Sequence, residues 1–391
     1  MNPKISKEEF VMRQKRIQEL MLEREIDLIV AYADDRYVYG QAYARWLCNY
    51  QPQFEPACAL LPAKGDMVMI TGAESEAFVP VSSYCDHAKV VENFLHPDEK
   101  YPYVMIHSFD SILKEMEGIL GKKIATVGYA GLSDMPHALY KMFQKKFDMG
   151  KSVDASLLFT QLRMIKSESE IAVIRYAYRI GQAGMKAALC EVREGVSERD
   201  IAAEAEYVMR KMGGEGLGIE MMVAFGTMNT HPILARTTFR TLKKGDLVSI
   251  TIAPRYEGYH GPLARAFVFE ETNEEMDIAL TAAERAMEAA KQELVHGNDG
   301  TAADRVSRQV MREANLEQYY AYTGIHSVGV TEFEAPIMGP ETKICIEKNM
   351  VLSVDIPVFL APWGGFRIEN GFLVTDGAPE QLVELETLIK K

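Results

Sequence analysis

The fold is decided by one stretch of the sequence, KKGDLVSITIAPRYEGYHGPLARAF, which spans Lys243–Phe267. After the Lys-Gly-Asp turn, apolar residues alternate with small ones over 248–253, and this period of two is typical of a half-buried strand. Tyr256–Gly258 has the composition of a turn, and an apolar run resumes after Pro262. Proline cannot donate a hydrogen bond to a strand ladder, so the second strand is expected to begin near it. The stretch therefore predicts a strand, a turn and a returning strand.

Length, charge and cysteine content exclude several classes of protein. With 391 residues, the chain is expected to form one or two domains. It has 43 basic and 56 acidic residues, and this net charge of −13 argues against binding to nucleic acid or to an anionic membrane surface. No apolar run approaches the roughly 18 residues of a membrane span, and the N-terminus lacks the apolar segment of a signal peptide. The five scattered cysteines favour reduced thiols, and we expect a cytoplasmic protein.

Helical and strand patterns alternate in the first part of the chain. Helices are expected over residues 7–25, 106–120 and 135–147, and short strands over 26–30, 57–61, 67–70, 89–91 and 124–127. Such alternation is typical of an α/β domain, which we place at residues 1–157. The region 158–391 begins with two amphipathic helices that Ser167 and Ser197 are expected to cap. Its later helices are expected over about 273–296 and 301–314.

Three motifs of the second region resemble those of a known family. The central stretch is similar to a pattern GD-L-V-x-x-D-x-G…Y-x-x-D-x-x-R-T-F. Residues 162–187 resemble the R-x-I-K-S-x-x-E-I segment that opens the family's catalytic domain, and residues 195–202, GVSERDIA, resemble its second helix. On these motifs the chain is identified as a member of the creatinase / aminopeptidase P / prolidase family of pita-bread hydrolases. The resemblance implies an α/β N-terminal domain (1–157), an α+β pita-bread catalytic domain (158–391) and a homodimer.

The resemblance also identifies the family's metal-binding positions. Most members hold two divalent metals through Asp, Asp, His, Glu and Glu side chains. In this sequence the five positions are Thr251, Pro262, His326, Asp355 and Glu369. Two carboxylates are therefore missing, although a two-metal site needs bridging carboxylates. We expect no metal cofactor; the alternative is a single divalent metal on His326, Asp355 and Glu369.

His231 is the predicted general base. It lies in the segment FGTMNTHP, residues 225–232, where the family has a histidine that contacts substrate and assists proton transfer. An unperturbed imidazole pKa of about 6.5 suits this role. The alternative is a loop histidine that is bonded to the backbone. His326, Asp355 and Glu369 are expected to be catalytic with His231, and the two carboxylates would orient or stabilise a cationic centre in the substrate.

Five further residues are expected to bind substrate: Arg367, Tyr259, His260, Phe333 and Glu55. Arg367 shares a motif with Glu369 and is expected to hydrogen-bond polar groups. Tyr259 and His260 come from the central hairpin. Glu55 lies in the segment that is similar to the one supplying a substrate-binding arginine in creatinase, and its carboxylate is expected to select a cationic group.

Phe333 stands where the family has a second histidine near the site, and it keeps aromatic bulk there. Glu332 and Glu334 flank it. If these residues form a strand, both glutamates share one face and Phe333 takes the other.

The resemblance to creatinase directs the functional prediction. Creatinase hydrolyses a C–N bond without metal, and it too lacks the aspartate pair. We therefore expect a metal-independent, creatinase-like hydrolase that cleaves a C–N bond of a small polar substrate, such as an N-substituted amino acid, a guanidino compound or a cyclic amidine. The alternatives are a metal-dependent Xaa-Pro aminopeptidase or dipeptidase with a degenerate site, a C–N or C–S lyase, and a non-catalytic peptide-binding pseudo-peptidase. The expected partner is a small molecule, with no nucleic acid and no membrane.

Overall fold

A computed structural model describes residues 2–36, 38–147, 151–271 and 273–389. The chain forms two compact units, one of Ile5–Arg163 and one that runs from Met164 to the C-terminus and includes the residues before Ile5. The predicted boundary lay after residue 157, whereas the units divide after Arg163. Helix α6, Ser156–Arg163, explains the difference because it packs on α1 and β6 of the N-terminal unit.

The N-terminal unit contains one seven-stranded sheet with strand order β5-β4-β3-β2-β1-β6-β7. Its strand β1 pairs antiparallel with β2 and parallel with β6, and all residues of β1 and β2 are buried. The predicted strands at residues 57–61 and 67–70 are present as β2 and β3, which pair antiparallel. The bounds are α1 Lys7–Glu23, β1 Leu28–Ala33, α2 Ala42–Cys48, β2 Ala57–Pro62, β3 Val68–Thr71, α3 Phe78–Ser82, β4 Ala88–Val91, η1 Glu92–Phe94, β5 Ile106–His107, α4 Phe109–Leu120, β6 Thr126–Ala130, α5 His137–Lys146 and β7 Lys151–Asp154.

The C-terminal unit is built on an eight-stranded sheet with the path β15-β14-β16-β17-β13-β10-β9, and β18 pairs with β17. A smaller sheet has the order β12-β11-β8. The bounds are α7 Glu168–Glu191, α8 Glu198–Lys211, β8 Gly216–Leu217, β9 Met222–Phe225, α9 Gly226–Thr230, β10 Leu247–Ile252, β11 Pro254–Tyr256, β12 Tyr259–His260, β13 Leu263–Val268, α10 Glu274–Glu293, α11 Ala302–Glu313, η2 Glu317–Tyr319, β14 Ile325–Ser327, β15 Glu334–Ile337, β16 Val351–Ala361, β17 Gly364–Leu373 and β18 Glu380–Gln381.

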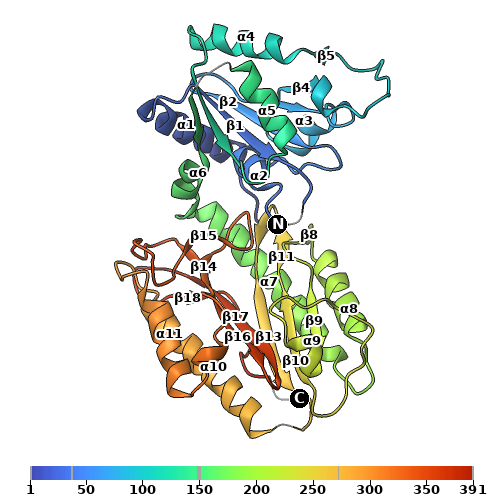
Figure 1. Ribbon diagram of the computed structural model, residues 1–391, viewed down its shortest axis with the longest axis vertical. Helices are drawn as coiled ribbons and strands as arrows, with labels where there is room; N and C mark the ends of the chain where they lie inside the picture. Colours follow the sequence, from blue (N-terminus) through green and yellow to red (C-terminus); the bar gives the residue numbers. More distant parts are fainter. Residues whose placement is uncertain (1, 37, 148–150, 272, 390–391) are drawn as a thin grey trace. The chain divides into compact units, whose positions relative to one another are not determined.

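Helices flank the eight-stranded sheet. Figure 1 shows α10 and α11 beside β16 and β17, and α8 beside β9 at the other end of the sheet. The apolar core lies between α10 and the strands it covers, with alanines and methionines of the helix against residues of β16 and β17. Helix α7 packs on the β11–β12 hairpin and on the start of β13. Gly261 permits this contact, because a Cβ there would lie 2.4 Å from the backbone nitrogen of Tyr178.

The sequence predicted the start of both leading helices of this unit. Ser167 and Glu170 form a reciprocal capping box at α7, and Ser197 and Asp200 form another at α8. The central stretch folds as predicted into strands, β10 to β13, and β13 begins at the residue after Pro262. The mixed α/β fold class is confirmed. None of the helices in the described ranges has the length and apolarity that a bilayer crossing requires.

One local prediction was wrong. Residues 328–333 are an irregular connection, and β15 begins only at Glu334. The register between β14 and β15 also shifts at His326 and Ser327. Strand alternation therefore does not apply to Glu332, Phe333 and Glu334, and their side chains go to three different sets of partners.

Candidate active site

The strand register places polar residues in one row across the main sheet. Thr251 of β10 pairs with Ala264 of β13, Ala264 pairs with Glu369 of β17, and Glu369 pairs with Asp355 of β16. Side chains of directly paired residues point to the same face, with Cβ atoms about 4.5–5.5 Å apart. The two carboxylates therefore lie side by side, and the neighbouring places in the row hold only a hydroxyl and a methyl group.

A narrow cleft runs along the same face. Its lining includes Ser249 and Thr251 from β10 and Arg367 from β17. The remaining lining residues are mainly apolar and come from β9, the end of α9, the segment after α9 and β16: Met222, Ala224, Thr230, Pro232, Ile233, Ala235 and Phe359. The cleft has room for about one water molecule in this structure. It is thus an apolar slot with the guanidinium of Arg367 on its wall.

Three buried donors converge beside the row: His326, Glu332 and Glu369. Each offers one ligand atom, and these atoms all lie within 4.8 Å of one another. The imidazole Nδ1 of His326 is 3.1 Å from the carbonyl oxygen of Ser327. Because a carbonyl can only accept, Nδ1 carries the proton, and the lone pair is on Nε2. That nitrogen is 4.0 Å from the Glu369 carboxylate, so it faces the cluster.

Asp355 and Arg367 form the adjoining part of the site. Oδ2 of Asp355 accepts a hydrogen bond from the Tyr322 hydroxyl and lies 3.8 Å from Nη1 of Arg367. The other oxygen, Oδ1, is buried and has no hydrogen-bond partner among the described residues. Arg367 donates from Nη2 to the carbonyl oxygen of Ile233 at 2.6 Å, which ties the strand to the segment after α9.

Burial dominates the protonation of these groups. It lowers the pKa of His326 to about 4, so the imidazole is neutral at pH 7. It raises the pKa of Glu332 to about 7, although Arg367 acts in the opposite direction. Burial and the neighbouring carboxylates of Asp355 and Glu332 raise the pKa of Glu369 well above its usual value. The site thus holds more buried carboxyl groups than Arg367 can pair with, and these groups keep their protons to a higher pH than usual.

A buried ion pair contacts the residue that follows His326. Nζ of Lys166 donates to Oγ of Ser327 at 2.6 Å and lies 3.1 Å from a carboxylate oxygen of Glu334. Both charged side chains are almost fully buried. Phe333 stacks on the imidazole of His326 with ring centroids 4.1 Å apart. The two rings and the ion pair hold the connection 328–333 in place. The Glu332 carboxylate extends from this connection to the cluster.

His231 lies outside this cluster, at the end of α9. Its Nδ1 is 3.1 Å from the carbonyl oxygen of Ala361, and its own carbonyl accepts from the amide of Leu360. It stands between two residues of the cleft, Thr230 and Pro232. Glu198 holds this segment, since its carboxylate accepts from the amides of Phe225 and Thr238. The catalytic role of His231 stays a prediction.

The remaining predicted residues have structural partners. The Tyr259 hydroxyl donates to Glu170 at 2.7 Å. Nδ1 of His260 is 3.0 Å from the Gly329 carbonyl oxygen, and its buried Nε2 has no partner among the described residues. Glu55 belongs to the N-terminal unit, where its carboxylate accepts from the amides of Glu74 and Ser75. The substrate-binding roles of these three residues stay predictions.

The reading of the sequence missed two residues of the site. Glu332 was placed by strand alternation, yet its carboxylate joins His326 and Glu369. Lys166 was seen only as part of a helix-entry motif, although it is one of the largest fully buried side chains.

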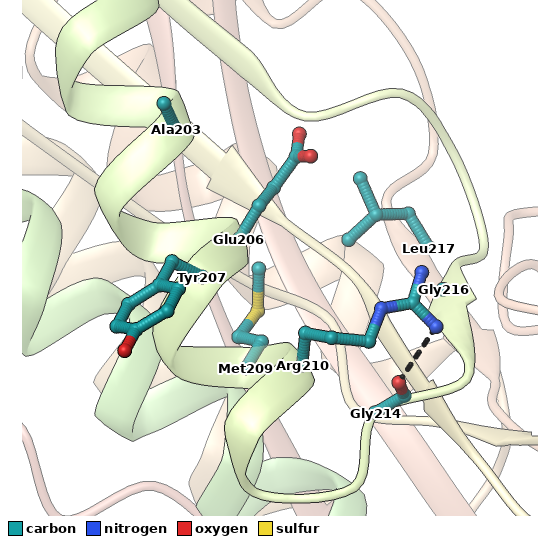
Figure 2. Close-up of a pocket in the computed structure, with 8 residues that line it drawn as sticks. All are labelled: Ala203, Glu206, Tyr207, Met209, Arg210, Gly214, Gly216 and Leu217. Atoms are coloured by element: carbon teal, nitrogen blue, oxygen red, sulfur yellow. Dashed lines mark hydrogen bonds between the residues drawn. The ribbon is translucent and has the colours of Figure 1, made fainter.

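A larger cavity of about 390 Å³ lies elsewhere on the C-terminal unit, between α8 and residues 214–217. Figure 2 shows Glu206 and Arg210 on the helix side, with Arg210 donating to the carbonyl oxygen of Gly214 at 3.1 Å. Its lining residues include none of the donors described above. The cavity is therefore separate from the donor cluster of His326, Glu332 and Glu369.

Comparison with known proteins settles the family. Residues 172–376 match the metallopeptidase family M24, and residues 13–165 match the creatinase/prolidase N-terminal domain. The chain belongs to metallopeptidase family M24. The chain is 28% identical over 329 residues to the Xaa-Pro dipeptidase of Pyrococcus horikoshii, a match that covers 83% of this chain and 88% of that protein.

Solved M24 structures share the fold. A prolidase from Pyrococcus horikoshii superposes with a TM-score of 0.82 at 21% identity, covering 96% of this chain and 99% of that one. An X-Pro aminopeptidase from Thermotoga maritima gives a TM-score of 0.80 at 22% identity, covering 96% and 98%. These likenesses confirm the pita-bread architecture. Family membership also confirms the predicted class of activity, a hydrolase that acts on C–N bonds.

Two predictions are corrected by these relatives. The expectation of a metal-independent, creatinase-like hydrolase is wrong, because the similar proteins are Xaa-Pro dipeptidases and the M24 family is one of metallopeptidases. The expectation of no metal cofactor is wrong for the same reason. The loss of two aspartates therefore does not predict a metal-free hydrolase in a chain that is similar to Xaa-Pro dipeptidases over most of its length. The relatives favour the alternative of a metal-dependent Xaa-Pro peptidase.

The donor set of this M24 chain fits one cation and not two. Thr251 and Pro262 stand at two of the five positions that hold the metal pair in most of the family, and neither supplies a carboxylate. On the other side of the row, His326, Glu332 and Glu369 converge, and Oδ1 of Asp355 is buried without a partner. A cation would complete these donors, since buried carboxylates need a hydrogen bond or a charge partner.

Proposed function

We propose that this M24 protein hydrolyses small peptides of the Xaa-Pro type and requires a divalent cation. The observation that carries the proposal is the apolar cleft beside the donor cluster, with Arg367 on its wall. The similarity to the Xaa-Pro dipeptidases over most of the chain supports it. Nothing in the described site favours a lyase or a non-catalytic peptide-binding protein over a hydrolase.

The cleft suits a proline-containing peptide in two respects. Its apolar lining, which includes Met222, Ile233 and Phe359, matches the pyrrolidine ring. The guanidinium of Arg367 provides a planar pair of donors for a terminal carboxylate. Because the cleft has room for about one water molecule, the segment after α9 must move outward to admit a dipeptide. Leu234 of this segment is 75% exposed, so little packing opposes such a movement.

The reaction adds water across the scissile bond. The water oxygen bonds to the carbonyl carbon, the C–N bond breaks, and the imino nitrogen takes up a proton. His231 suits the proton transfer, because Nδ1 donates to the Ala361 carbonyl and the lone pair is therefore on Nε2. Arg367 and the cleft orient the peptide. A bound cation supplies the polarisation of the carbonyl and lowers the pKa of water.

Proline release from Ala-Pro tests the proposal, with Ala-Ala as the comparison peptide. We expect release in the presence of Mn²⁺ and loss of release after chelation. Arg367→Met is expected to raise KM by at least tenfold, since one charge-assisted contact contributes about 1.5–3 kcal/mol. Arg175→Met is the matched control, because Arg175 forms an exposed ion pair with Glu380. Failure to release proline from Xaa-Pro peptides with any divalent cation would refute the proposal.

We also propose that the protein acts as a homodimer, which the family resemblance supports. Light scattering on the purified full chain measures this directly. A mass of about one chain at micromolar concentration would contradict the proposal.

A further inference from the structure

We propose that Glu332 completes a site for a single divalent cation together with His326 and Glu369. The proposal deepens the function above, which requires a cation. The new element is Glu332, which comes from the connection between β14 and β15 and not from the strand row of the sheet. It supplies a carboxylate to a site that lacks the two carboxylates at Thr251 and Pro262.

The geometry of the three donors supports a metal site. Their ligand atoms lie within 4.8 Å of one another, and the three residues are 1%, 8% and 1% exposed, in chain order. Nε2 of His326 has the free lone pair and faces Glu369 at 4.0 Å. A metal-binding histidine usually donates its other nitrogen to a carbonyl or carboxylate, and Nδ1 of His326 does so to Ser327.

A second observation is independent of the cluster. Oδ1 of Asp355 is buried, has no partner among the described residues, and belongs to a residue that is 3% exposed. Asp355 pairs with Glu369 across β16 and β17, so both side chains point to the same face. A buried carboxylate oxygen without a donor is costly. A cation held by Glu369 would satisfy it.

The charge balance fits one divalent cation. Asp355, Glu332 and Glu369 are three buried carboxyl groups, and Arg367 acts on all three. Once a bound cation has displaced their protons, three negative charges less one positive charge leave an excess of two. Glu334 does not enter this balance, because Lys166 neutralises it at 3.1 Å. One M²⁺ ion would therefore neutralise the site, and two would overcharge it.

The donor types indicate which cations bind. One imidazole and two or three carboxylates suit Mn²⁺, Co²⁺ or Zn²⁺ better than Ca²⁺, which prefers six to eight oxygen ligands. A second ion would have to bind near Thr251 and Pro262. A hydroxyl and a proline ring give it no charged ligand there.

Equilibrium dialysis of the full-length apoprotein against Mn²⁺, followed by plasma mass spectrometry, tests the stoichiometry. We expect one equivalent of metal per chain. Glu332→Gln keeps the side-chain volume and removes the charge, and it is expected to weaken Mn²⁺ binding by at least tenfold. Glu380→Gln is the matched control, because Glu380 is an exposed glutamate in an ion pair with Arg175. The electron paramagnetic resonance signal of bound Mn²⁺ gives a readout that does not depend on activity.

Folding of the variant is checked separately by thermal unfolding without metal. Glu332→Gln replaces a buried carboxyl group, whose ionisation is costly in this site, with a neutral amide of the same size, so the apo variant is expected to unfold no earlier than the parent protein. Mn²⁺ should raise the unfolding temperature of the parent protein and of Glu380→Gln, but much less that of Glu332→Gln.

The possible outcomes separate this proposal from the proposed function. Zero or two equivalents of metal, or one equivalent that binds equally well to Glu332→Gln, would overturn the single-cation site. One equivalent that depends on Glu332 supports it, even if Xaa-Pro peptides are not cleaved; in that case only the peptidase proposal fails. Cleavage of Xaa-Pro peptides that requires two equivalents of metal would support the peptidase proposal and overturn the single-cation site.

Discussion

Replacing Lys166 with methionine removes the cation that neutralises Glu334. The Lys166 side chain is 1% exposed, that of Glu334 is 6% exposed, and their charged atoms are 3.1 Å apart. Loss of one member of a buried pair leaves an uncompensated charge and typically costs about 3–5 kcal/mol. Lys166 also donates to Ser327 at 2.6 Å, and that bond is lost as well. We therefore expect Lys166→Met to destabilise the C-terminal unit by at least 3 kcal/mol.

The two tryptophans allow this unit to be observed on its own. Trp46 lies in the N-terminal unit and Trp363 in the C-terminal unit, where it packs on Phe366. Urea unfolding followed by fluorescence in a Trp46→Phe background therefore reports the unit that contains Lys166. With a slope of about 3 kcal/mol per molar urea, a loss of 3 kcal/mol shifts the midpoint by about 1 M. The double variant Lys166→Met, Glu334→Gln should recover a large part of this loss.

Two results would contradict the reasoning. A midpoint shift below about 0.3 M for Lys166→Met would mean that Glu334 is neutralised without the lysine. A double variant as unstable as the single one would mean that the lost stability came from packing of the lysine stem and not from the exposed charge.

Two further predictions concern Asp27 of the N-terminal unit and the two positions of the site that lack a carboxylate. Burial opposes ionisation of Asp27, but hydrogen bonds from Lys122 and from the amides of Thr126 and Ala125 lower its pKa below the usual value. This stabilisation is therefore complete above about pH 4 and is lost as the pH falls through the lower, folded-state pKa. The stability difference between the parent protein and Asp27→Asn, measured from Trp46 fluorescence in a Trp363→Phe background, should therefore shrink below pH 4. A difference that stays constant from pH 6 to pH 3 would contradict this prediction. Restoring both missing carboxylates with Thr251→Asp and Pro262→Asp should raise Mn²⁺ stoichiometry from one to two equivalents, whereas binding that stays at one would show that other features limit the site.

The sequence contained most of the information about the architecture. Period-two alternation in 248–253 and the proline before the returning strand predicted β10 and β13, because those patterns depend on local geometry. The serine caps of α7 and α8 are equally local. The unit boundary was less predictable, since α6 belongs to the N-terminal unit through contacts with distant α1 and β6.

The candidate site was only partly predictable. His326, Asp355, Glu369 and Arg367 were located through motifs, and the structure brings these four residues together. Glu332 was misplaced because alternation assumes a regular strand, whereas β15 starts two residues later. A pattern in sequence cannot reveal an irregular connection whose course is set by a register shift and by a buried ion pair.

These observations connect the stability of the site to its chemistry. His326 lies directly before Ser327, and Glu332 lies two residues before Glu334. The same Lys166 ammonium binds both Ser327 and Glu334, so it holds both ends of the connection that carries Glu332 and the residue next to His326. In the sheet row, each ligand is fixed by its own strand, but Glu332 has no strand to fix it. A cation site built with Glu332 therefore depends on the buried lysine, and Lys166→Met should weaken Mn²⁺ binding even where the unit remains folded.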